Sequence, residues 1–433
     1  MTEMFCHLHD ANISYCVLRN YEQLPHSCGT SDLDMWVASK DAEACERIFA
    51  EVAKETKSVL ASYTADQHCP KLCYLNADEG IQIDLFKGCI ICKRKPMFEE
   101  SDIMANTVEY NGIKVLDERF GDVMAFLKEI LNNGKCNEKY TKSLDDNKSV
   151  FTSEYLKSKL AKFSSDFCDL FAETIAVGNY KEGFADLTQM GRKCLGITGS
   201  SLNLSNLTKS TRLFKPTGYT IAVLGTDGSG KSFIIDHITP ILNEAFHNGI
   251  RYEHMRPNYL SSLAVASGKK KDTEEAHTVC TDPHGSKPSG LIGSIVRLSY
   301  YWLDYTWGYF RKVWLDKTFK THIWLFDRYY YDYYVDQRRA RLNLPNWIIK
   351  LYGLFVPTPD LTICLGGDPG KIYARKPETS LEEVIRQTKV LQDFARKHKK
   401  AVWVDTTTST EKSIKAAMDA IVEMMSKRFQ IKA

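Results

Sequence analysis

The residues with the clearest chemistry lie at positions 225–232, which read Gly-Thr-Asp-Gly-Ser-Gly-Lys-Ser. The pattern Gly-x-x-x-x-Gly-Lys-Ser is typical of a loop whose backbone N–H groups surround a phosphate chain. Its lysine, Lys231, would neutralise the β- and γ-phosphates, and the hydroxyl of Ser232 would bind Mg²⁺. We therefore predict ATP and Mg²⁺ as cofactors. The residues of this loop expected to bind nucleotide are Gly225, Asp227, Gly228, Ser229, Gly230, Lys231 and Ser232.

A buried strand and a helix have to hold this loop in place. Four apolar residues at 221–224 precede it, and residues 233–245 have helical character. The order of strand, glycine-rich turn and helix is the context that the motif requires. A chance glycine-rich turn is the alternative, and this context disfavours it.

The rest of the C-terminal region alternates between strand-like and helix-like segments, which predicts a parallel α/β sheet flanked by helices. Ligands in such sheets bind at the carboxyl ends of the strands. Asp227, Arg256, Asp327 and Arg328 all fall at such ends. Asp327 follows an apolar run, so it is expected to bind Mg²⁺ or its water, and Arg328 is expected to hold a phosphate. The alternatives are a turn residue for Asp327 and a surface ion pair for Arg328.

A second set of carboxylates lies near the N-terminus. Asp32 and Asp34 alternate with Leu33, so a strand places both carboxylates on one face, and Asp84 lies on a later strand. Three gathered carboxylates repel one another unless cations neutralise them, which predicts a Mg²⁺ site for nucleotidyl or phosphoryl transfer. The spacing fits three ordinary surface aspartates equally well.

Composition sets the broad class. A chain of 433 residues exceeds one ordinary core, so about two or three domains are expected. A formal net charge of +3 gives no reason to expect nucleic acid as a partner. Neither a signal peptide nor a membrane span is predicted, so the 13 cysteines are expected to be reduced thiols of a cytoplasmic protein. The pairs Cys69/Cys73 and Cys89/Cys92 fit zinc binding less well than buried thiols.

The chain divides into four predicted regions. Residues 1–135 form an α+β domain, and residues 136–198 form a helical connector with one amphipathic helix over 151–176. Residues 199–217 are rich in Ser, Thr and Asn and form a linker. Residues 218–433 form the domain with the phosphate loop. Whether the protein is a monomer or a homodimer stays open.

The N-terminal region resembles the nucleotidyltransferase fold over residues 13–130. The resemblance rests on residues 18–25, Leu-Arg-Asn-Tyr-Glu-Gln-Leu-Pro, and on residues 31–34, Ser-Asp-Leu-Asp. It implies that Asp32, Asp34 and Asp84 are metal-binding carboxylates. Arg19-Asn20 replaces the Gly-Ser with which typical members hold the triphosphate. Binding of a nucleotide or sugar phosphate is therefore the alternative to nucleotidyl transfer.

Residues 218–425 resemble the thymidylate kinase family of nucleoside monophosphate kinases. The matching residues are 225–232, with Asp227 inside the loop, and 327–329, Asp-Arg-Tyr. The resemblance implies that Asp227 reads a sugar hydroxyl of the acceptor and that a lid at 374–378 brings Arg375 and Lys376 over the phosphates.

The acceptor segments depart from that family. Residues 300–307 are aromatic, and Arg256-Pro257 replaces the usual Arg-Glu-Pro. With Pro-His-Gly at 283–285 and Asp-Arg-Tyr-Tyr-Tyr-Asp at 327–332, the chain is similar to kinase-like proteins of bacterial surface-polysaccharide gene sets. The resemblance implies a nucleoside monophosphate, a sugar, a polyol or a sugar phosphate as small-molecule acceptor.

These observations predict an ATP-dependent phosphotransferase in which Lys231, Asp327, Arg328 and Arg375 are catalytic. Two alternatives stay open. The chain is bifunctional if the N-terminal domain is also a nucleotidyltransferase, and it is a non-catalytic switch if it binds ATP without turnover.

Overall fold

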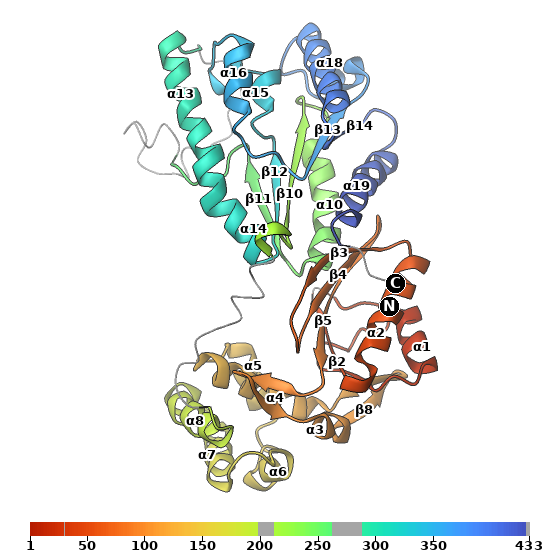
Figure 1. Cartoon of the computed structure of the whole chain (residues 1–433), viewed down its shortest axis with the longest axis vertical. Coiled ribbons are helices and arrows are strands. Elements are labelled where there is room, and N and C mark those ends of the chain that lie inside the picture. The colour runs from red at the N-terminus through yellow and green to blue at the C-terminus, as the bar shows by residue number, and fades with distance from the viewer. Residues whose placement is uncertain (30, 198–211, 262–287, 430–433) are drawn as a thin grey trace.

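The computed structural model describes residues 1–29, 31–197, 212–261 and 288–429. Most of the predicted linker, at 199–211, lies outside the described residues, as do the Pro-His-Gly at 283–285 and most of the glycine- and proline-containing loop expected at 282–289. Two sheets follow one another along the long axis of the molecule, and helices pack against both (Figure 1). The N-terminal and C-terminal halves are described in turn.

The N-terminal half contains a mixed sheet of seven strands in the order β3-β4-β5-β2-β1-β9-β8. Helices α1 and α2 cover one face of this sheet with the apolar side chains of a single core. The strands expected to place Asp34 and Asp84 are both present. The elements are α1 (Thr2–Asp10), β1 (Tyr15–Val17), β2 (Leu33–Val37), α2 (Ala42–Glu55), β3 (Val59–Thr64), β4 (Lys71–Leu75), β5 (Gly80–Lys87), β8 (Thr107–Tyr110) and β9 (Ile113–Leu116), with a separate ribbon of β6 (Ile90–Cys92) and β7 (Lys95–Phe98).

The opposite face of this sheet is covered by helices of residues 100–133 and by the connector, whose apolar residues share one core. The helices are α3 (Glu100–Ala105), α4 (Glu118–Asn133), α5 (Glu138–Asp146), α6 (Ser153–Lys159), α7 (Ser165–Val177) and α8 (Tyr180–Cys194). The prediction of a single helix over 151–176 is wrong, because two helices, α6 and α7, occupy this stretch. Ser164 accepts a hydrogen bond from the N–H of Phe167 at 3.3 Å, so it caps a new helix where the pattern suggested continuity.

The C-terminal half contains five parallel strands in the order β11-β12-β10-β13-β14. Helices flank the sheet, which confirms the predicted α/β class and is consistent with a P-loop fold. The aromatic residues 300–307 lie where α13 passes into a π-helix, which begins at Asp304. The elements are β10 (Tyr219–Gly225), α10 (Lys231–Ala245), β11 (Ile250–His254), α13 (Leu291–Leu303), the π-helix η2 (Asp304–Trp314), α14 (Leu315–Phe319), β12 (Ile323–Asp327), α15 (Asp332–Val335), α16 (Asn346–Gly353), β13 (Leu361–Gly366), α17 (Pro369–Arg375), α18 (Leu381–Lys397), β14 (Ala401–Asp405) and α19 (Thr410–Ser426).

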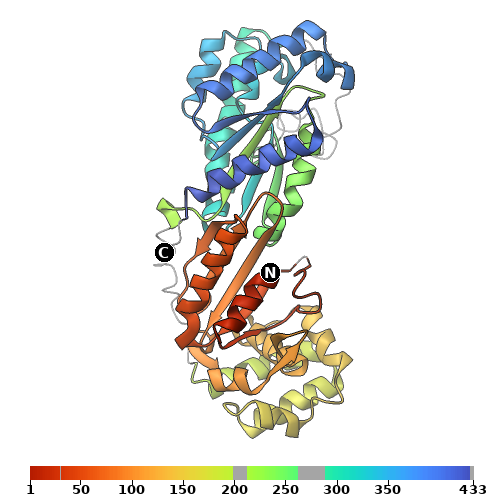
Figure 2. The ribbon, with the colours of Figure 1, turned by 90° about the vertical axis from the view of Figure 1, so that its right-hand side faces the viewer.

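The two halves share an apolar core. Helices α10 and α19 lie against β3, β4 and β5, as the two views of the ribbon show (Figures 1 and 2). Cys73 and Leu75 of β4 belong to the same buried cluster as Leu242 of α10. The hydroxyl of Tyr219 donates to the carbonyl of Ala61 at 2.5 Å, which ties the first strand of the C-terminal sheet to β3. Among the described helices, none combines the length and apolar character needed to cross a bilayer.

Candidate functional site

The predicted phosphate loop lies between the end of β10 and the start of α10. Gly228 and Gly230 have positive φ angles of 81° and 84°. A Cβ atom on Gly228 would lie 2.6 Å from the carbonyl oxygen of Ile372, so the turn and the close approach of α17 both favour glycine there. Lys231 is buried, and its Nζ donates to the carbonyls of Gly225 at 3.0 Å and Thr226 at 2.9 Å. The loop therefore holds a lysine ammonium against its own carbonyls.

A network of charges surrounds the loop aspartate, Asp227. Arg328, at the end of β12, donates from Nη2 to Asp227 Oδ1 at 2.7 Å and from Nη1 to Asp332 Oδ1 at 2.9 Å. Arg339 binds the other oxygen, Asp227 Oδ2. Arg328 has a φ of 71°, which turns the chain sharply after the strand. The structure thus brings together the predicted residues Asp227, Lys231 and Arg328, with Asp332 and Arg339 added.

Burial and neighbouring charges shift the pKa values of this network. Burial lowers the pKa of Lys231 to about 7, and the adjacent charge of Arg328 acts in the same direction. Burial alone would raise the pKa of Asp227, but Arg328, Lys231 and Arg339 lower it to about 2. The loop aspartate is therefore ionised at neutral pH.

The predicted magnesium residue Asp327 has one free oxygen. Its Oδ2 lies 3.3 Å from both the hydroxyl of Tyr252 and Nδ1 of His254. Its Oδ1 is buried and has no hydrogen-bond partner among the described residues. A buried carboxylate oxygen without a partner is unusual in proteins and suits a hard cation such as Mg²⁺. Ser232 is exposed in the first turn of α10, so its hydroxyl is open to a ligand.

The predicted lid residues, Arg375 and Lys376, lie beside the loop, but their side chains contact other residues. The backbone of Lys376 runs next to Gly228, where a Cβ atom would lie 3.2 Å from the Cβ of Lys376. The Nζ of Lys376, however, pairs with Glu378 at 2.9 Å. Arg375 donates from Nη2 to the carbonyl of Thr406 at 2.9 Å. Neither cation forms an ion pair with the loop in this structure.

Arg256 lies after β11 and is held by the π-helix. Its Nη1 lies 3.0 Å from Asp304 Oδ2, and its guanidinium stacks 5.0 Å from the centre of the Tyr301 ring. Asp304 is fully buried and also accepts from the backbone N–H groups of residues 258–260 at 3.0–3.2 Å. The aromatic segment thus supplies a carboxylate that fixes an arginine and the loop after β11.

The three N-terminal carboxylates come together as predicted. Asp34 and Asp84 are paired across β2 and β5, and Asp32 directly precedes β2. One oxygen of each lies within 4.8 Å of the others, and all three residues are buried. Among the described His, Cys, Asp and Glu side chains, this is the group of three or more close enough to share an ion. The four cysteines weighed for zinc are two buried thiols, Cys73 and Cys92, and two half-buried ones, Cys69 and Cys89.

Protein cations already surround these carboxylates. Arg19 pairs with Asp34 and reaches Asp32 at 3.9 Å, and Lys71 pairs with Asp84. Burial raises the pKa of Asp34, and the charge of Arg19 opposes that shift. Three carboxylate oxygens at this spacing fit a divalent cation with little movement. Arg19 and Lys71 are both partly exposed, so they can turn away when such an ion binds.

A cleft of about 320 Å³ opens beside this cluster. Asp34 and Arg19 lie on its wall, and α4 and α5 supply Lys128, Lys139 and Asp122. Burial raises the pKa of Asp122 to about 6, and a hydrogen bond from Ser143 opposes the shift. The cleft offers cations for a phosphate next to carboxylates for a metal.

The C-terminal half also reaches the carboxylate cluster. His247 follows α10, and its Nδ1 lies 3.8 Å from Asp32 Oδ1. The phosphate loop lies at the other end of α10, so this helix and the turn after it connect the two candidate sites.

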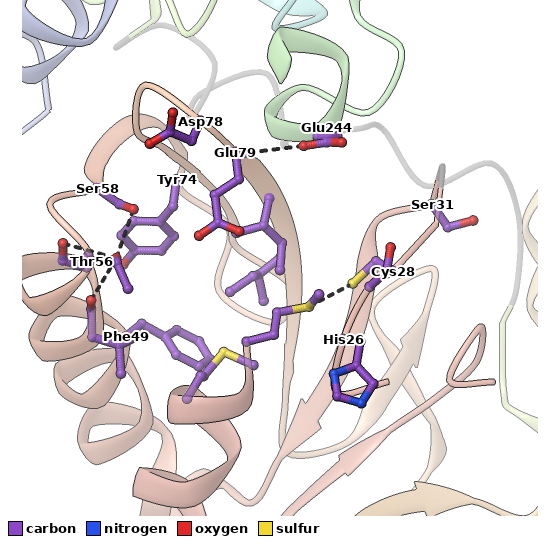
Figure 3. A pocket seen from close by; sticks show the side chains of 18 of the residues that line it. His26, Cys28, Ser31, Phe49, Thr56, Ser58, Tyr74, Asp78, Glu79 and Glu244 are labelled. Atoms are coloured by element: carbon purple, nitrogen blue, oxygen red, sulfur yellow. Dashed lines mark hydrogen bonds between the residues drawn. The ribbon is translucent and has the colours of Figure 1, made fainter. Parts of the chain in front are cut away.

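A separate cavity of about 270 Å³ lies where α10 meets the N-terminal half (Figure 3). Phe49 and Tyr74 line it on the apolar side, and Asp78, Glu79 and Glu244 bring carboxyl groups to it. Glu244 Oε2 accepts from the N–H of Gly80 at 3.3 Å across the junction. None of the predicted site residues lines this cavity.

Several residues of the two sites were not predicted. Asp332 is four residues beyond Arg328, a spacing that could have suggested an ion pair. Arg339 belongs to the basic run 338–341, and no motif in that run connects it to the loop aspartate. Lys71, His247 and His254 come from distant segments and had no signal in the sequence. Arg19 was noted at the position of the usual Gly-Ser, but its ion pairs with Asp32 and Asp34 were not predicted.

Comparison with known proteins adds little to this geometry. No protein-family model matches the chain, and no curated protein matches it. Among solved structures, thymidylate kinase from Ehrlichia chaffeensis is similar to it at 16% sequence identity and a TM-score of 0.31. The match covers 48% of this chain and 98% of that one. A TM-score this low carries no argument about activity, so the inferences below rest on the site itself.

Proposed function

We propose that the chain is an ATP- and Mg²⁺-dependent phosphotransferase. Its C-terminal half would move the γ-phosphoryl group to a small acceptor, namely a nucleoside monophosphate, a sugar, a polyol or a sugar phosphate. The observation that carries this proposal is the set of buried cations, Lys231 and Arg328, at a phosphate-loop sequence on the carboxyl ends of parallel strands. The unpartnered oxygen of Asp327 beside them supports a divalent cation.

The chemistry asked of these residues is positioning and charge stabilisation. Lys231 exchanges its bonds to the loop carbonyls for phosphate oxygens, and Arg328 stabilises the charge that spreads over the transferring group. Asp227, oriented by Arg339, accepts a hydrogen bond from an acceptor hydroxyl. Ser232 and Asp327 would hold Mg²⁺, which neutralises phosphate charge when bound. Arg375 and Lys376 lie next to the loop and would add cations once the segment closes.

The transfer is balanced without a further reactant. An acceptor oxygen forms a bond to the γ-phosphorus while the bond from that phosphorus to the bridging oxygen of ADP breaks. The acceptor proton leaves to solvent or to a nearby base. ADP and the phosphorylated acceptor are the products.

The test is acceptor-dependent ADP formation by the purified chain with labelled ATP and a panel of nucleotides, sugars and sugar phosphates. We expect turnover with one acceptor class and its loss in Lys231→Ala. Turnover that is unchanged in Lys231→Ala would contradict the proposal. ATP binding without any turnover would favour the switch alternative instead.

A second activity is supported by the N-terminal half. Three buried carboxylates lie beside a cleft that carries Arg19, Lys128 and Lys139. This arrangement suits a metal-dependent nucleotidyl transfer that would act on the phosphorylated product, or the binding of a nucleotide or sugar phosphate. Release of pyrophosphate that disappears in Asp32→Ala supports transfer. Binding of a nucleotide without pyrophosphate release from any nucleoside triphosphate supports the binding function.

A further inference from the structure

The outer side of the C-terminal half carries an unusual concentration of exposed apolar side chains. Of the 21 large hydrophobic residues that are exposed in the described chain, ten lie on α13, η2 and the segment around α16. Scattered exposed residues of this kind need no explanation, but a contiguous patch marks an interaction surface. We name this patch the aromatic face. It consists of Leu291, Ile292, Val296, Leu303, Trp307, Phe310, Trp347, Leu351, Leu354 and Phe355.

The two segments of the aromatic face lie side by side. The ring of Trp302 is 5.9 Å from the ring of Tyr352 and 6.4 Å from that of Phe355. Ser299 and Tyr352 share a hydrogen bond of 2.9 Å between their hydroxyl groups. Figure 1 shows α13 and α16 next to one another. Along η2 the ring of Trp307 lies 6.4 Å from that of Phe310, and the ring of Phe310 lies 4.9 Å from that of Trp314, so these rings form one cluster.

Tryptophan is concentrated at this location. Four of the seven tryptophans of the chain, residues 302, 307, 314 and 347, lie on η2, α13 and α16. Trp307 and Trp347 are 57% and 66% exposed. Amphipathic rings of this kind are enriched at the interface between a bilayer and water.

The charges of the aromatic face have one sign. Residues 291–315 and 345–356 contain a single carboxylate, Asp304, and it is fully buried. Arg311 and Lys350 are exposed, and the guanidinium of Arg311 lies 6.0 Å from the centre of the Trp307 ring. Asp304 pairs with Arg256 instead. The face therefore combines apolar rings and exposed cations with no exposed acid of its own.

This charge pattern decides between two occupants. A second copy docked about a two-fold axis would place the same cations against the same face, where no exposed carboxylate is available to pair with them. An anionic headgroup layer supplies that partner, while the rings enter the boundary with the acyl chains. We propose that the aromatic face binds the surface of a bilayer that contains anionic phospholipid. The proposal does not depend on the phosphotransferase activity.

The experiment is flotation of the full-length protein with vesicles of phosphatidylcholine, and with vesicles of phosphatidylcholine mixed with phosphatidylglycerol. We expect the protein to float with the mixed vesicles, with less bound at high salt. Trp307→Ser combined with Phe310→Ser should lower the bound fraction by about tenfold, because the variant lacks two exposed rings that would enter the bilayer. Met104→Ser combined with Val177→Ser, also exposed apolar residues but on α3 and α7, should leave it unchanged.

A charge variant separates binding from folding. Arg311→Glu combined with Lys350→Glu alters only exposed polar groups, and it should abolish the preference for anionic vesicles while the far-ultraviolet circular dichroism stays that of the parent. Failure of the parent protein to bind anionic vesicles overturns the proposal, and so does equal binding to both vesicle types. A dimer seen by light scattering that the Trp307/Phe310 variant dissociates assigns the face to a second copy and also overturns it.

Discussion

The two candidate sites differ in which charged side chains are buried. At the phosphate loop the cations are deeply buried, whereas at the N-terminal carboxylate cluster the carboxylates are buried and the cations are partly exposed. Lys231 and Arg328 are 9% and 5% exposed as side chains, and Arg19 and Lys71 are 37% and 44% exposed. A fixed cation prepares a site for an anion, and fixed carboxylates with movable counter-charges prepare a site for a cation. The difference supports our proposal of a polyphosphate site in the C-terminal half and a metal site in the N-terminal half.

The pKa values follow the same division. In the C-terminal site, burial would raise the pKa of Asp227 and Asp327, but neighbouring cations lower both. In the N-terminal half, burial dominates and raises the pKa of Asp34 and Asp122. The surrounding protein therefore stabilises the ionised form of Asp227 and Asp327, whereas burial disfavours the ionised form of Asp34 and Asp122.

The largest expected effect is on ADP formation, which should depend on the C-terminal site and not on the N-terminal cluster. Lys231→Ala removes the buried ammonium that faces the phosphates, so ADP formation should fall by about 100-fold or more. Asp84→Asn changes only the N-terminal cluster and should leave ADP formation within about twofold of the parent. Lys389→Ala, an exposed lysine on α18, is the matched control for loss of a positive charge. An equal loss in Asp84→Asn would mean that the two sites work as one.

The second prediction concerns divalent cations. If the N-terminal cluster binds Mg²⁺ or Mn²⁺, a concentration about 100 times its dissociation constant should stabilise the fold by about 2.7 kcal/mol. The rise in melting temperature should be lost in Asp84→Asn and kept in Asp327→Asn when no nucleotide is present. Glu129→Gln, in the cleft but outside the cluster, is the control. A rise that survives in Asp84→Asn would place the ion outside the cluster, and no rise in the parent would show that Arg19 and Lys71 occupy the cluster permanently.

The sequence revealed the chemistry of each site better than the contacts that hold it. Local signals placed Gly225 to Ser232, Asp327 and Arg328 at the strand ends, because a loop motif and an apolar run are each contained in one segment. The alternation of Asp32 and Asp34 with Leu33 likewise predicted their shared face. The counter-charges could not be predicted, because Arg339 is 112 residues from Asp227 and His247 is 215 residues from Asp32. The break between α6 and α7 was missed because apolar residues keep recurring at intervals of three and four across it.

The third prediction tests whether Asp227 belongs to the acceptor. Arg339→Ala removes one of the two arginines that orient this carboxylate, so the KM for the acceptor should rise by about tenfold with little change in the KM for ATP. Arg338→Ala is the matched control, since Arg338 is exposed and precedes Arg339 in the same turn. A change in the KM for ATP alone would assign Arg339 to the donor phosphates.

The smallest expected effect is on the free energy of unfolding, which removal of a carboxylate should lower in one region and raise in the other. The folded pKa of Asp227 is about 2, below its unfolded value, so its contribution to stability is present above pH 4 and is lost as the pH falls toward 2. Asp227→Asn should therefore destabilise the protein at neutral pH, by about 1–2 kcal/mol. The folded pKa of Asp122 is about 6, above its unfolded value, so its ionisation costs stability as the pH rises through 6.

Asp122→Asn removes that cost and should stabilise the protein above pH 6, by about 1 kcal/mol once its partial exposure is allowed for. Below about pH 3, where Asp122 is protonated in both states because an unfolded aspartate titrates near pH 4, the variant and the parent should unfold together. Urea unfolding of both variants across this pH range measures the two signs side by side. If Asp122→Asn and Asp227→Asn shift the free energy of unfolding in the same direction at neutral pH, the proposed electrostatic difference between the two sites is contradicted.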